Sequence, residues 1–320
     1  MSLHPKDEAT YAAFALGWTA VRKMPERTAY ATFSKVADRT WKRRGAGVAQ
    51  LEKNLKRVVP EASPADLREM SRESMRKYFR YWCDAFRMPD WTPERIVGSF
   101  SCLGEQNLID NLAAGPGIVI AVSHMGNWDH AGAWVNLVHS PVTSVAERLK
   151  PERLFEKFLA YRRSLGLRIY PLGEPNLIDT LCEELRTEKR IVGLLADRDL
   201  TARGIPVSFF GEPTRMPAGP ANLSLRTKSP LVAASLWYDG PKSFARIYPL
   251  IAIPEGAPTG DNARNEPGYA KAIQTMTQQV ANHLESGIRE HPTDWHMLQK
   301  LWLSDLDPAR LAASDAKGGG

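Results

Sequence analysis

The sequence has few cysteines, opens without an apolar segment and contains no long apolar run. Its three cysteines, Cys83, Cys102 and Cys182, are widely spaced and form no Cys-x-x-Cys pair. A disulfide framework and a structural zinc site are therefore not expected, and a reducing compartment fits best. The N-terminal residues carry several charges and lack the apolar core of a secretory signal. No apolar stretch approaches the ~20 residues of a membrane-spanning helix, so we expect a cytosolic protein that could still lie on a membrane.

Several catalytic motifs are also missing. The sequence has no Gly-x-Ser-x-Gly segment, so a serine hydrolase would have no obvious nucleophile. It has neither the Gly-x-x-x-x-Gly-Lys-Ser/Thr loop that binds nucleotide phosphates nor the glycine fingerprint of dinucleotide-binding proteins. The cysteines have no activating neighbours in the sequence, and we assign them to packing. Nucleotide hydrolysis and dinucleotide redox chemistry are thus not indicated.

The charge balance is basic, with 42 Lys and Arg against 36 Asp and Glu and a formal net charge of +6. Such an excess suits an anionic partner, which could be a nucleic acid, an anionic lipid surface or a phosphorylated ligand. Many soluble proteins carry the same excess without any special partner, so charge alone leaves the partner open. Apolar and charged fractions of 43% and 24% indicate an ordinary globular chain.

Residues 1–98 have the pattern of a helical layer. Apolar side chains recur at helical spacing over 11–24, and Pro25 ends this helix. A shorter helix is predicted over 51–59, and Ser63 is expected to cap a third, longer one.

An arginine row marks one face of that third helix. Its members, spaced four residues apart, are Arg68, Arg72, Arg76 and Arg80. The row, and the apolar stripe of the first helix with Phe14 and Trp18, could dock on anionic lipid. A solvated charge row and a stripe buried in the core are the commoner outcomes, and both alternatives stay open.

From Gly115 onward, short apolar segments alternate with helical patterns. Such alternation predicts βαβ units and a largely parallel central sheet flanked by helices. The predicted strands cover 117–123, 142–145, 167–171, 191–196, 231–237 and 244–250. The last two, joined by Asp239-Gly240, are predicted to form an antiparallel hairpin at one edge of the sheet. A long helix is predicted over 269–288.

The chain is therefore expected to have an α/β fold with a single domain. That domain would cover residues 1–307, with a helical N-terminal region at 1–98 and a catalytic core at 99–307. The small polar residues 308–320 are expected to be a flexible tail.

The segment Ser123-His-Met-Gly-Asn-Trp-Asp129 places two titratable side chains just beyond the apolar strand 117–123. The carboxyl end of a strand is where open parallel sheets bind ligands. Across a turn and a first helical turn, the Asp129 carboxylate could reach the His124 imidazole and fix its tautomer. The other ring nitrogen would then be free to take a proton from a hydroxyl.

Two other interpretations of this segment compete with a catalytic base. A His-Asp pair can simply satisfy polar groups at the start of a helix. His124, Asp129 and His130 together also offer ligand atoms for a metal ion. However, the usual metallo-hydrolase pattern has a second histidine ahead of the Asp-His pair, where this sequence has Met125 and Gly126, so no metal is expected.

The wider sequence resembles a known family. A strand followed by His-x-x-x-x-Asp is the signature of the glycerolipid and lipid A acyltransferase superfamily, and further blocks follow in the expected order. They are Val145-Ala-Glu-Arg-Leu-Lys-Pro151, Tyr161-Arg-Arg-Ser-Leu-Gly166, Ala196-Asp-Arg-Asp-Leu200, Phe209-Phe-Gly-Glu-Pro-Thr-Arg-Met-Pro-Ala-Gly-Pro-Ala221 and His291-Pro-Thr-Asp-Trp-His-Met-Leu-Gln299. Together they resemble the actinobacterial phosphatidylinositol mannoside acyltransferases over residues 10–306, with an acyltransferase-like fold.

This resemblance implies transfer of a long acyl group, typically palmitoyl, from acyl-CoA to a mannose hydroxyl of phosphatidylinositol mannosides. It implies a monomer bound peripherally to the anionic inner leaflet, at the cytoplasmic face of the plasma membrane, with no nucleic-acid partner. Acyl-CoA would be a co-substrate, and no cofactor or metal would be needed. The acyl-chain length, the mannose that is acylated and the range of glycolipid acceptors stay open.

The resemblance also implies roles for individual residues. His124 would be the general base on the mannose hydroxyl, with Asp129 as its orienting partner and no covalent acyl-enzyme. Glu147, Arg162 and Asp197 would complete the substrate site. At position 197 the family pattern has Glu, which is one methylene longer, so the role of Asp197 is open.

Two arginines, Arg198 and Arg215, are further candidates for substrate binding. The Thr214-Arg215 pair ahead of a helix start at Gly219-Pro220 could bind the phosphates of CoA, or could serve only the turn and its packing. Backbone N–H groups at the helix start near Gly126 and Asn127, or a nearby arginine, could stabilise the oxyanion of the reaction. Trp295 and His296 are assigned to packing, with a place along an acyl channel as the alternative.

Three functions remain as hypotheses. The first is an acyl-CoA-dependent O-acyltransferase for phosphatidylinositol mannosides, or for another membrane glycolipid. The second is a metal-dependent hydrolase that uses His124, Asp129 and His130. The third is a peripheral lipid-binding protein in which the His-Asp pair has only a structural role.

Overall fold

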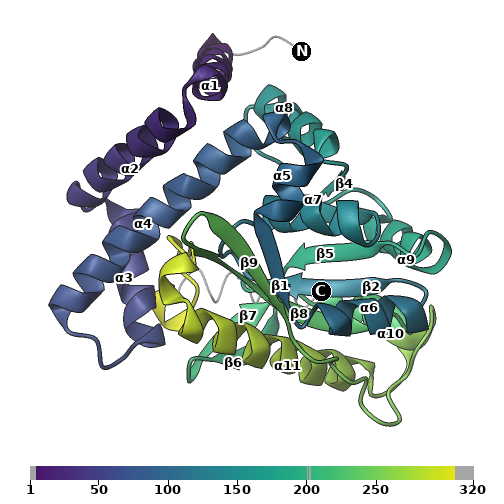
Figure 1. Cartoon of the computed structure of the whole chain (residues 1–320). Helices are drawn as coiled ribbons and strands as arrows, with labels where there is room; N and C mark the ends of the chain where they lie inside the picture. The colour runs from purple at the N-terminus through teal and green to yellow at the C-terminus, as the bar shows by residue number, and fades with distance from the viewer. Residues whose placement is uncertain (1–4, 200, 202, 307–320) are drawn as a thin grey trace.

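The structure, a computed structural model, describes residues 5–199, 201 and 203–306 (Figure 1). The tail predicted at 308–320 lies outside these residues. Within them, the chain forms a mixed α/β fold built around one large sheet.

The N-terminal part is a layer of helices on one side of the molecule (Figure 1). Its helices are α1 (Pro5–Lys23), α2 (Glu26–Lys42), α3 (Ala46–Val58) and α4 (Pro64–Arg87), followed by a 3-10 turn at Met88–Asp90. The short helix α5 (Pro93–Gly98) lies outside this layer, against the helix Trp128–Val138. The predicted start of α4 is confirmed, because Ser63 and Asp66 form a reciprocal capping box around its first turn. Helix α2 was missed, since its buried residues are only Ala29 and Ala37, which give a weak apolar pattern.

The main sheet has seven strands in the order β1-β9-β8-β2-β5-β3-β4. Their bounds are β1 (Phe100–Leu103), β2 (Ile118–Val122), β3 (Val142–Ala146), β4 (Arg168–Pro171), β5 (Ile191–Leu195), β8 (Leu231–Asp239) and β9 (Lys242–Ile247). Strands β8, β2, β5, β3 and β4 run parallel, while β9 pairs antiparallel with β8. The largely parallel sheet predicted from the sequence is therefore confirmed.

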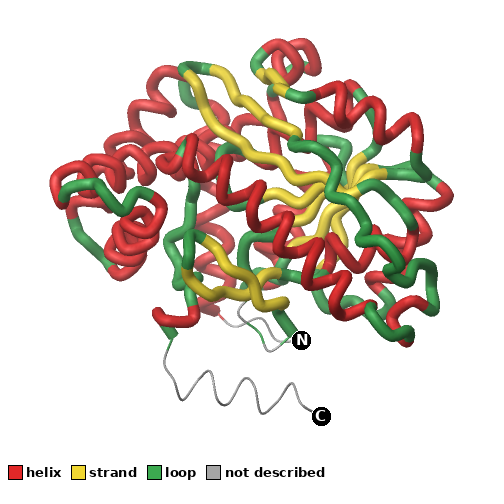
Figure 2. The backbone as a smooth tube through the Cα atoms, turned by 90° about the horizontal axis from the view of Figure 1, so that it is seen from below, coloured by secondary structure: helices red, strands yellow, loops and turns green. Residues whose placement is uncertain are grey.

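The β8–β9 hairpin does not lie at the edge of the sheet, so that part of the prediction was wrong. Strand β1 pairs in parallel with β9 and occupies the edge. A separate two-stranded ribbon, β6 (Ile205–Phe209) with β7 (Glu212–Met216), stands apart from the main sheet (Figure 2).

Helices cover both faces of the sheet. They are α6 (Glu105–Ala114), α7 (Trp128–Val138), α8 (Glu152–Ser164), α9 (Leu177–Thr187), α10 (Gly219–Thr227) and α11 (Tyr269–Glu290). Helix α7 contacts β1, β9 and β3, whereas α10 and α11 both contact β8 and one another on the other face. Short 3-10 turns at Ala263–Asn265, Pro292–Asp294 and Leu303–Asp305 complete the described chain. None of the helices in the described ranges is long and apolar enough to cross a membrane.

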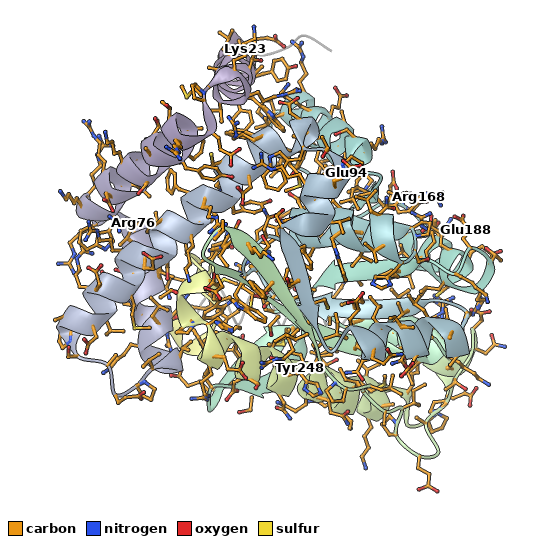
Figure 3. All side chains as sticks on the ribbon, viewed as in Figure 1. Lys23, Arg76, Glu94, Arg168, Glu188 and Tyr248 are labelled. Carbon is orange, nitrogen blue, oxygen red and sulfur yellow. The ribbon has the colours of Figure 1, made fainter. Side chains whose placement is uncertain are left out.

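The arginine row of α4 joins the helical layer together. Arg72 and Arg76 both bind the Asp38 carboxylate on α2, and Figure 3 shows Arg76 on the side of α4 that faces α2. Arg68 binds Glu52 on α3, and Arg80 donates to the backbone carbonyls at the β8–β9 turn. The row therefore serves packing between elements, and its guanidinium groups are engaged within the protein.

The apolar stripe of α1 is likewise part of the core. Trp18 is buried, donates its indole N–H to the Phe86 carbonyl at 3.0 Å and packs against Phe158 of α8. Phe14 lies against the same aromatic rings. Of the two alternatives for this stripe, burial in the core is the one observed.

Candidate functional site

Two neighbouring parallel strands end side by side at the candidate site. Val122 at the end of β2 is in register with Leu195 at the end of β5. The backbone continues for two residues beyond each of these strand ends, which brings His124 and Asp197 next to each other at the carboxyl ends of the parallel strands. The site is therefore positioned by the sheet register.

The carboxylate of Asp197 is fully buried and accepts three hydrogen bonds. His124 Nδ1 lies 2.6 Å from Asp197 Oδ1, and the backbone N–H of His124 donates to Oδ2 at 2.9 Å. The indole N–H of Trp295 donates to Oδ2 at 3.0 Å. Because the carboxylate accepts at Nδ1, the neutral ring carries its proton there and leaves Nε2 unprotonated. The imidazole side chain is 37% exposed, so substrate can approach it.

The electrostatics favour the protonated form of His124. Burial lowers the pKa of the imidazole, but the charge and hydrogen bond of Asp197 outweigh this effect and raise the pKa above its ordinary value. Burial in turn raises the pKa of Asp197, and the interactions with His124 and the hydrogen bond from Trp295 together lower it by more. In this pair, the Asp197 carboxylate thus increases the basicity of the His124 imidazole.

Asp129 does not contact His124, so the pairing predicted from the sequence was wrong. Asp129 lies in the first turn of α7, and its Oδ1 accepts from Arg162 Nε at 2.8 Å while Oδ2 accepts from the Tyr81 hydroxyl at 3.0 Å. The physical reason is that the helix start turns this carboxylate towards α8 and α4, away from the end of β5. Asp129 and Arg162 do lie together, as a largely buried ion pair.

Segment 291–297 near the C-terminus holds the loop that carries His124. The Gly126 amide donates to the Asp294 carbonyl at 2.9 Å, and the His296 amide donates to the His124 carbonyl at 2.7 Å. Gly126 has a φ of +58°, and a side chain there would lie 2.6 Å from the backbone of Leu236. The Gly126 amide is therefore engaged within the protein, which removes it as the oxyanion donor considered above.

His296 is a neutral part of this support. Its Nε2 donates to the Gly126 carbonyl at 3.1 Å, and burial lowers its pKa to about 3. Trp295 and His296 are both buried and lie outside the lining of the cavity described below. Packing, combined with a hydrogen bond to Asp197, is thus the role observed for Trp295. About a hundred residues separate it from Asp197 in the sequence, so no local pattern could have indicated this contact.

Two of the other predicted site residues lie close to His124. Glu147 directly follows β3, is exposed, and its charge raises the pKa of His124. Arg198 directly follows Asp197; its charge lowers that pKa, and its Nε donates to the Lys300 carbonyl at 2.9 Å. Both residues lie at the same edge of the sheet as the base because β2, β5 and β3 are adjacent.

Arg215 lies on β7, outside the main sheet. Its guanidinium donates to the Thr201 carbonyl at 3.2 Å, and its own carbonyl accepts from the Asp199 amide. It therefore contacts the loop that follows Asp197 and Arg198, while Thr214 beside it is buried and donates to the Leu301 carbonyl. This threonine serves packing.

His130 does not join His124 and Asp129. Its Nδ1 lies 3.0 Å from the Ser243 hydroxyl, and its Nε2 lies 2.9 Å from the Ile96 carbonyl. Both ring nitrogens are thus engaged in hydrogen bonds on the buried side of α7. Across the part of the chain that the structure describes, no three His, Cys, Asp or Glu side chains are grouped to hold a metal ion. The three-residue ligand set of the hydrolase hypothesis is contradicted by this geometry.

A narrow, mainly apolar cavity of about 110 Å³ lies between α7 and the sheet. All seven strands of the main sheet contribute to its lining, and the charged residues among the described lining are Asp129 and Arg162. His124 and Asp197 do not belong to this lining, but Trp128, which contacts the His124 ring edge-on, does. The cavity is therefore separated from His124 by one side chain, and its apolar lining suits a hydrocarbon chain.

Comparison with known proteins gives consistent relatives over nearly the whole chain. A sequence profile described as bacterial lipid A biosynthesis acyltransferase matches residues 2–304. A phosphatidylinositol mannoside acyltransferase from Mycobacterium tuberculosis is 42% identical over 95% of this chain and 92% of the relative. One from Mycolicibacterium smegmatis is 40% identical over 95% of both chains.

Proposed function

The chain belongs to the bacterial lipid A biosynthesis acyltransferase family, and from this premise we propose that it moves a long acyl group from acyl-CoA to a mannose hydroxyl of a phosphatidylinositol mannoside. The observation that carries the proposal is the His124–Asp197 pair beside Trp128, whose ring contacts His124 and lines an apolar cavity. The family makes the chain an acyltransferase, whereas donor, acceptor and mechanism belong to the proposal.

In the proposed mechanism, His124 Nε2 takes the proton of the acceptor hydroxyl. The hydroxyl oxygen then attacks the thioester carbonyl and forms a tetrahedral intermediate. Its collapse breaks the carbon–sulfur bond and releases the CoA thiolate, which recovers the proton from His124. Because a thioester is already activated, the reaction needs no ATP. Because the acceptor hydroxyl attacks the thioester directly, no covalent acyl-enzyme forms.

Asp197 and Arg162 have distinct supporting roles in this mechanism. Asp197 holds the tautomer of His124 and stabilises the imidazolium that forms after proton transfer. Arg162 lines the cavity, is anchored through Nε by Asp129, and carries a positive charge that would stabilise the oxyanion. Asp129 would then act through Arg162.

The extent of the cavity lining across the sheet supports a long acyl group, because all seven strands contribute to it. Seven adjacent strands are separated by six spacings of about 4.8 Å, which gives the sheet a width of ~29 Å. An extended chain advances ~1.2 Å per bond, as a polypeptide does, so the roughly fifteen carbon–carbon bonds of palmitoyl span ~18 Å. A fully extended palmitoyl chain therefore fits within the width of the sheet.

We propose that the site rim, residues 147–150 with Leu172, faces the membrane. Leu149 and Leu172 are 41% and 62% exposed, and Arg148 and Lys150 flank Leu149. The Leu172 amide donates to the Ala146 carbonyl, so the ends of β3 and β4 lie together. Exposed leucines beside basic side chains suit the surface of an anionic leaflet.

The proposal is tested by incubating the protein with labelled palmitoyl-CoA and a panel of lipids that includes phosphatidylinositol mannosides. We expect an acylated mannoside, identified by mass, together with free CoA. His124→Ala should lower the rate by about 10²-fold or more, because general-base help typically contributes that much.

His283→Ala is the matched control, since His283 lies on α11 and packs against Tyr248. It should keep the wild-type rate. Release of CoA without any acylated lipid would instead indicate a thioesterase, and an equal rate for His124→Ala would remove His124 from the mechanism.

A further inference from the structure

A glycine in the middle of a buried strand lines the cavity. Gly193 is the third of five residues in β5 and contributes to the lining beneath α7. Glycine weakens a strand, because it lacks a side chain to pack and loses more entropy on folding than other residues. Its presence at the centre of the sheet therefore calls for a reason.

The usual reasons for a strand glycine do not hold at this position. The φ of Gly193 is not positive, so the backbone conformation is open to any residue. A Cβ built on Gly193 meets no atom within 4 Å, so no neighbouring backbone needs the space. The position that a side chain of residue 193 would occupy is therefore open space.

That space belongs to the cavity. Side chains alternate along a strand, so Gly193 shares its face with Ile191 and Leu195, and both of these line the cavity. In register across the sheet, Gly193 pairs with Ile120 on β2 and Ser144 on β3, which are lining residues too. The Ser144 hydroxyl donates to the Gly193 carbonyl at 2.7 Å, so its polar group is already satisfied.

The cavity has a firm wall at its β1 end. Phe100 of β1 and Trp134 of α7 are stacked with ring centroids 4.9 Å apart, and both are buried. A long chain that extends towards β1 meets these two stacked rings, so further space for it has to come from within the cavity. Gly193 provides such space two residues before the end of β5.

We propose that Gly193 determines the length of acyl group that the protein accepts, by keeping the middle of the cavity open for a long chain. This inference rests on the proposed acyl transfer and adds a specificity-determining residue to it. A side chain at position 193 would occupy the space that a long chain fills, whereas a short chain would end before reaching it.

The test is a graded series, Gly193→Ala, Gly193→Val and Gly193→Leu, assayed with palmitoyl-CoA and butyryl-CoA. For palmitoyl, kcat/KM should fall in that order, by about tenfold or more with Leu, while butyryl transfer changes by about twofold at most. Gly98→Leu is the matched control, because Gly98 is exposed, has no neighbour within 4 Å of a built Cβ and lies outside the cavity.

A second readout does not depend on transfer. Binding of cis-parinaric acid, a long-chain fluorescent fatty acid, should weaken through the same series, while the Tm of Gly193→Ala rises above that of the wild type. A rising Tm with falling long-chain binding would not follow from structural damage.

The outcomes separate the two proposals. If Gly193→Leu accepts palmitoyl as the wild type does, or loses both donors equally while keeping its Tm, the inference is overturned. If the wild type transfers neither donor, the proposed function fails, and the fatty-acid binding of the series still decides the role of Gly193. Should the Leu variant not fold, the Ala and Val variants carry the same comparison.

Discussion

The basicity of His124 depends on one buried carboxylate. Asp197 raises the pKa of the ring above its ordinary value, against the effect of burial, which lowers it. The proposed base must be neutral to accept a proton, so activity should rise as the pH rises through this raised pKa. Of the charged groups near the ring, Glu147 acts in the same direction as Asp197, and Arg198 acts against both.

Asp197→Asn should therefore change both the rate and its pH dependence. Without the carboxylate, burial lowers the pKa of His124, and the rising limb of the pH–rate profile moves to lower pH. The plateau rate should fall by about 10²-fold or more, since the tautomer and the imidazolium lose their partner. The measurement is kcat/KM for acyl transfer between pH 5 and 9.

Asp197→Glu serves as the control because it keeps the charge. Its rising limb should stay near the pH of the wild type, whatever the lengthened side chain does to the rate. If the pH–rate profile of Asp197→Asn coincides with that of the wild type, Asp197 does not determine the pKa of His124.

At the scale of elements, three helices meet at Asp129. Through this carboxylate, α7 is joined to Arg162 on α8 and to Tyr81 on α4. Arg162 is largely buried, and burial lowers the pKa of its guanidinium. The charge and hydrogen bond of Asp129, together with the neighbouring Tyr81 and Tyr161, outweigh burial and raise this pKa. Losing the carboxylate would leave a buried cation without a partner, which is a costly state.

Asp129→Asn should thus destabilise the fold by about 3 kcal/mol, as breaking a buried ion pair does. Tyr81→Phe removes only one neutral donor from the same carboxylate and should cost about 1 kcal/mol. Equilibrium unfolding in urea measures both changes. Equal effects of the two substitutions would mean that the ion pair contributes little beyond an ordinary hydrogen bond.

Some helices and strands could be predicted from the sequence, and others could not. The strand ahead of His124 and the N-cap of α4 at Ser63 follow from local patterns, and both are confirmed. Strand β1 was missed because its four residues are too few for a pattern, and only its pairing with β9 defines it. The family resemblance is also confirmed.

The site shows the same limit. Its residues were named from the sequence, but His124 was assigned to Asp129, five residues away. Its observed partner is set by the register of β2 against β5, over a separation of 73 residues. A sequence pattern that recognises strand ends can place His124 and Asp197 at the carboxyl ends of their strands. It does not tell which residue of β2 pairs with which residue of β5, and that register is what brings the two side chains together.

At the scale of the whole molecule, the orientation on a membrane is the property to test. Leu149→Glu and Leu172→Glu should each lower the partition of the protein onto anionic vesicles by about tenfold, because a buried leucine contributes roughly 1.5–3 kcal/mol. Co-sedimentation with vesicles of anionic phospholipid measures this partition.

Leu250→Glu is the control. Leu250 is 51% exposed and follows the carboxyl end of β9. Because β9 runs antiparallel to β8, this end of β9 lies at the amino-terminal ends of the parallel strands, opposite the carboxyl ends that carry the site rim. Its substitution should leave vesicle binding unchanged. A loss as large as that of the Leu149 variant would show that the membrane contact lies elsewhere.

The contacts between segment 291–297 and the loop that carries His124 have a consequence for the order of folding. Ribosomes add residues in order, and the backbone groups that fix Met125, Gly126 and His124 are added about 170 residues after them. While earlier parts are already folding, the nascent chain still lacks Trp295, the indole donor to Asp197. The proposed base therefore gains its hydrogen-bonded support only after segment 291–297 has been synthesised.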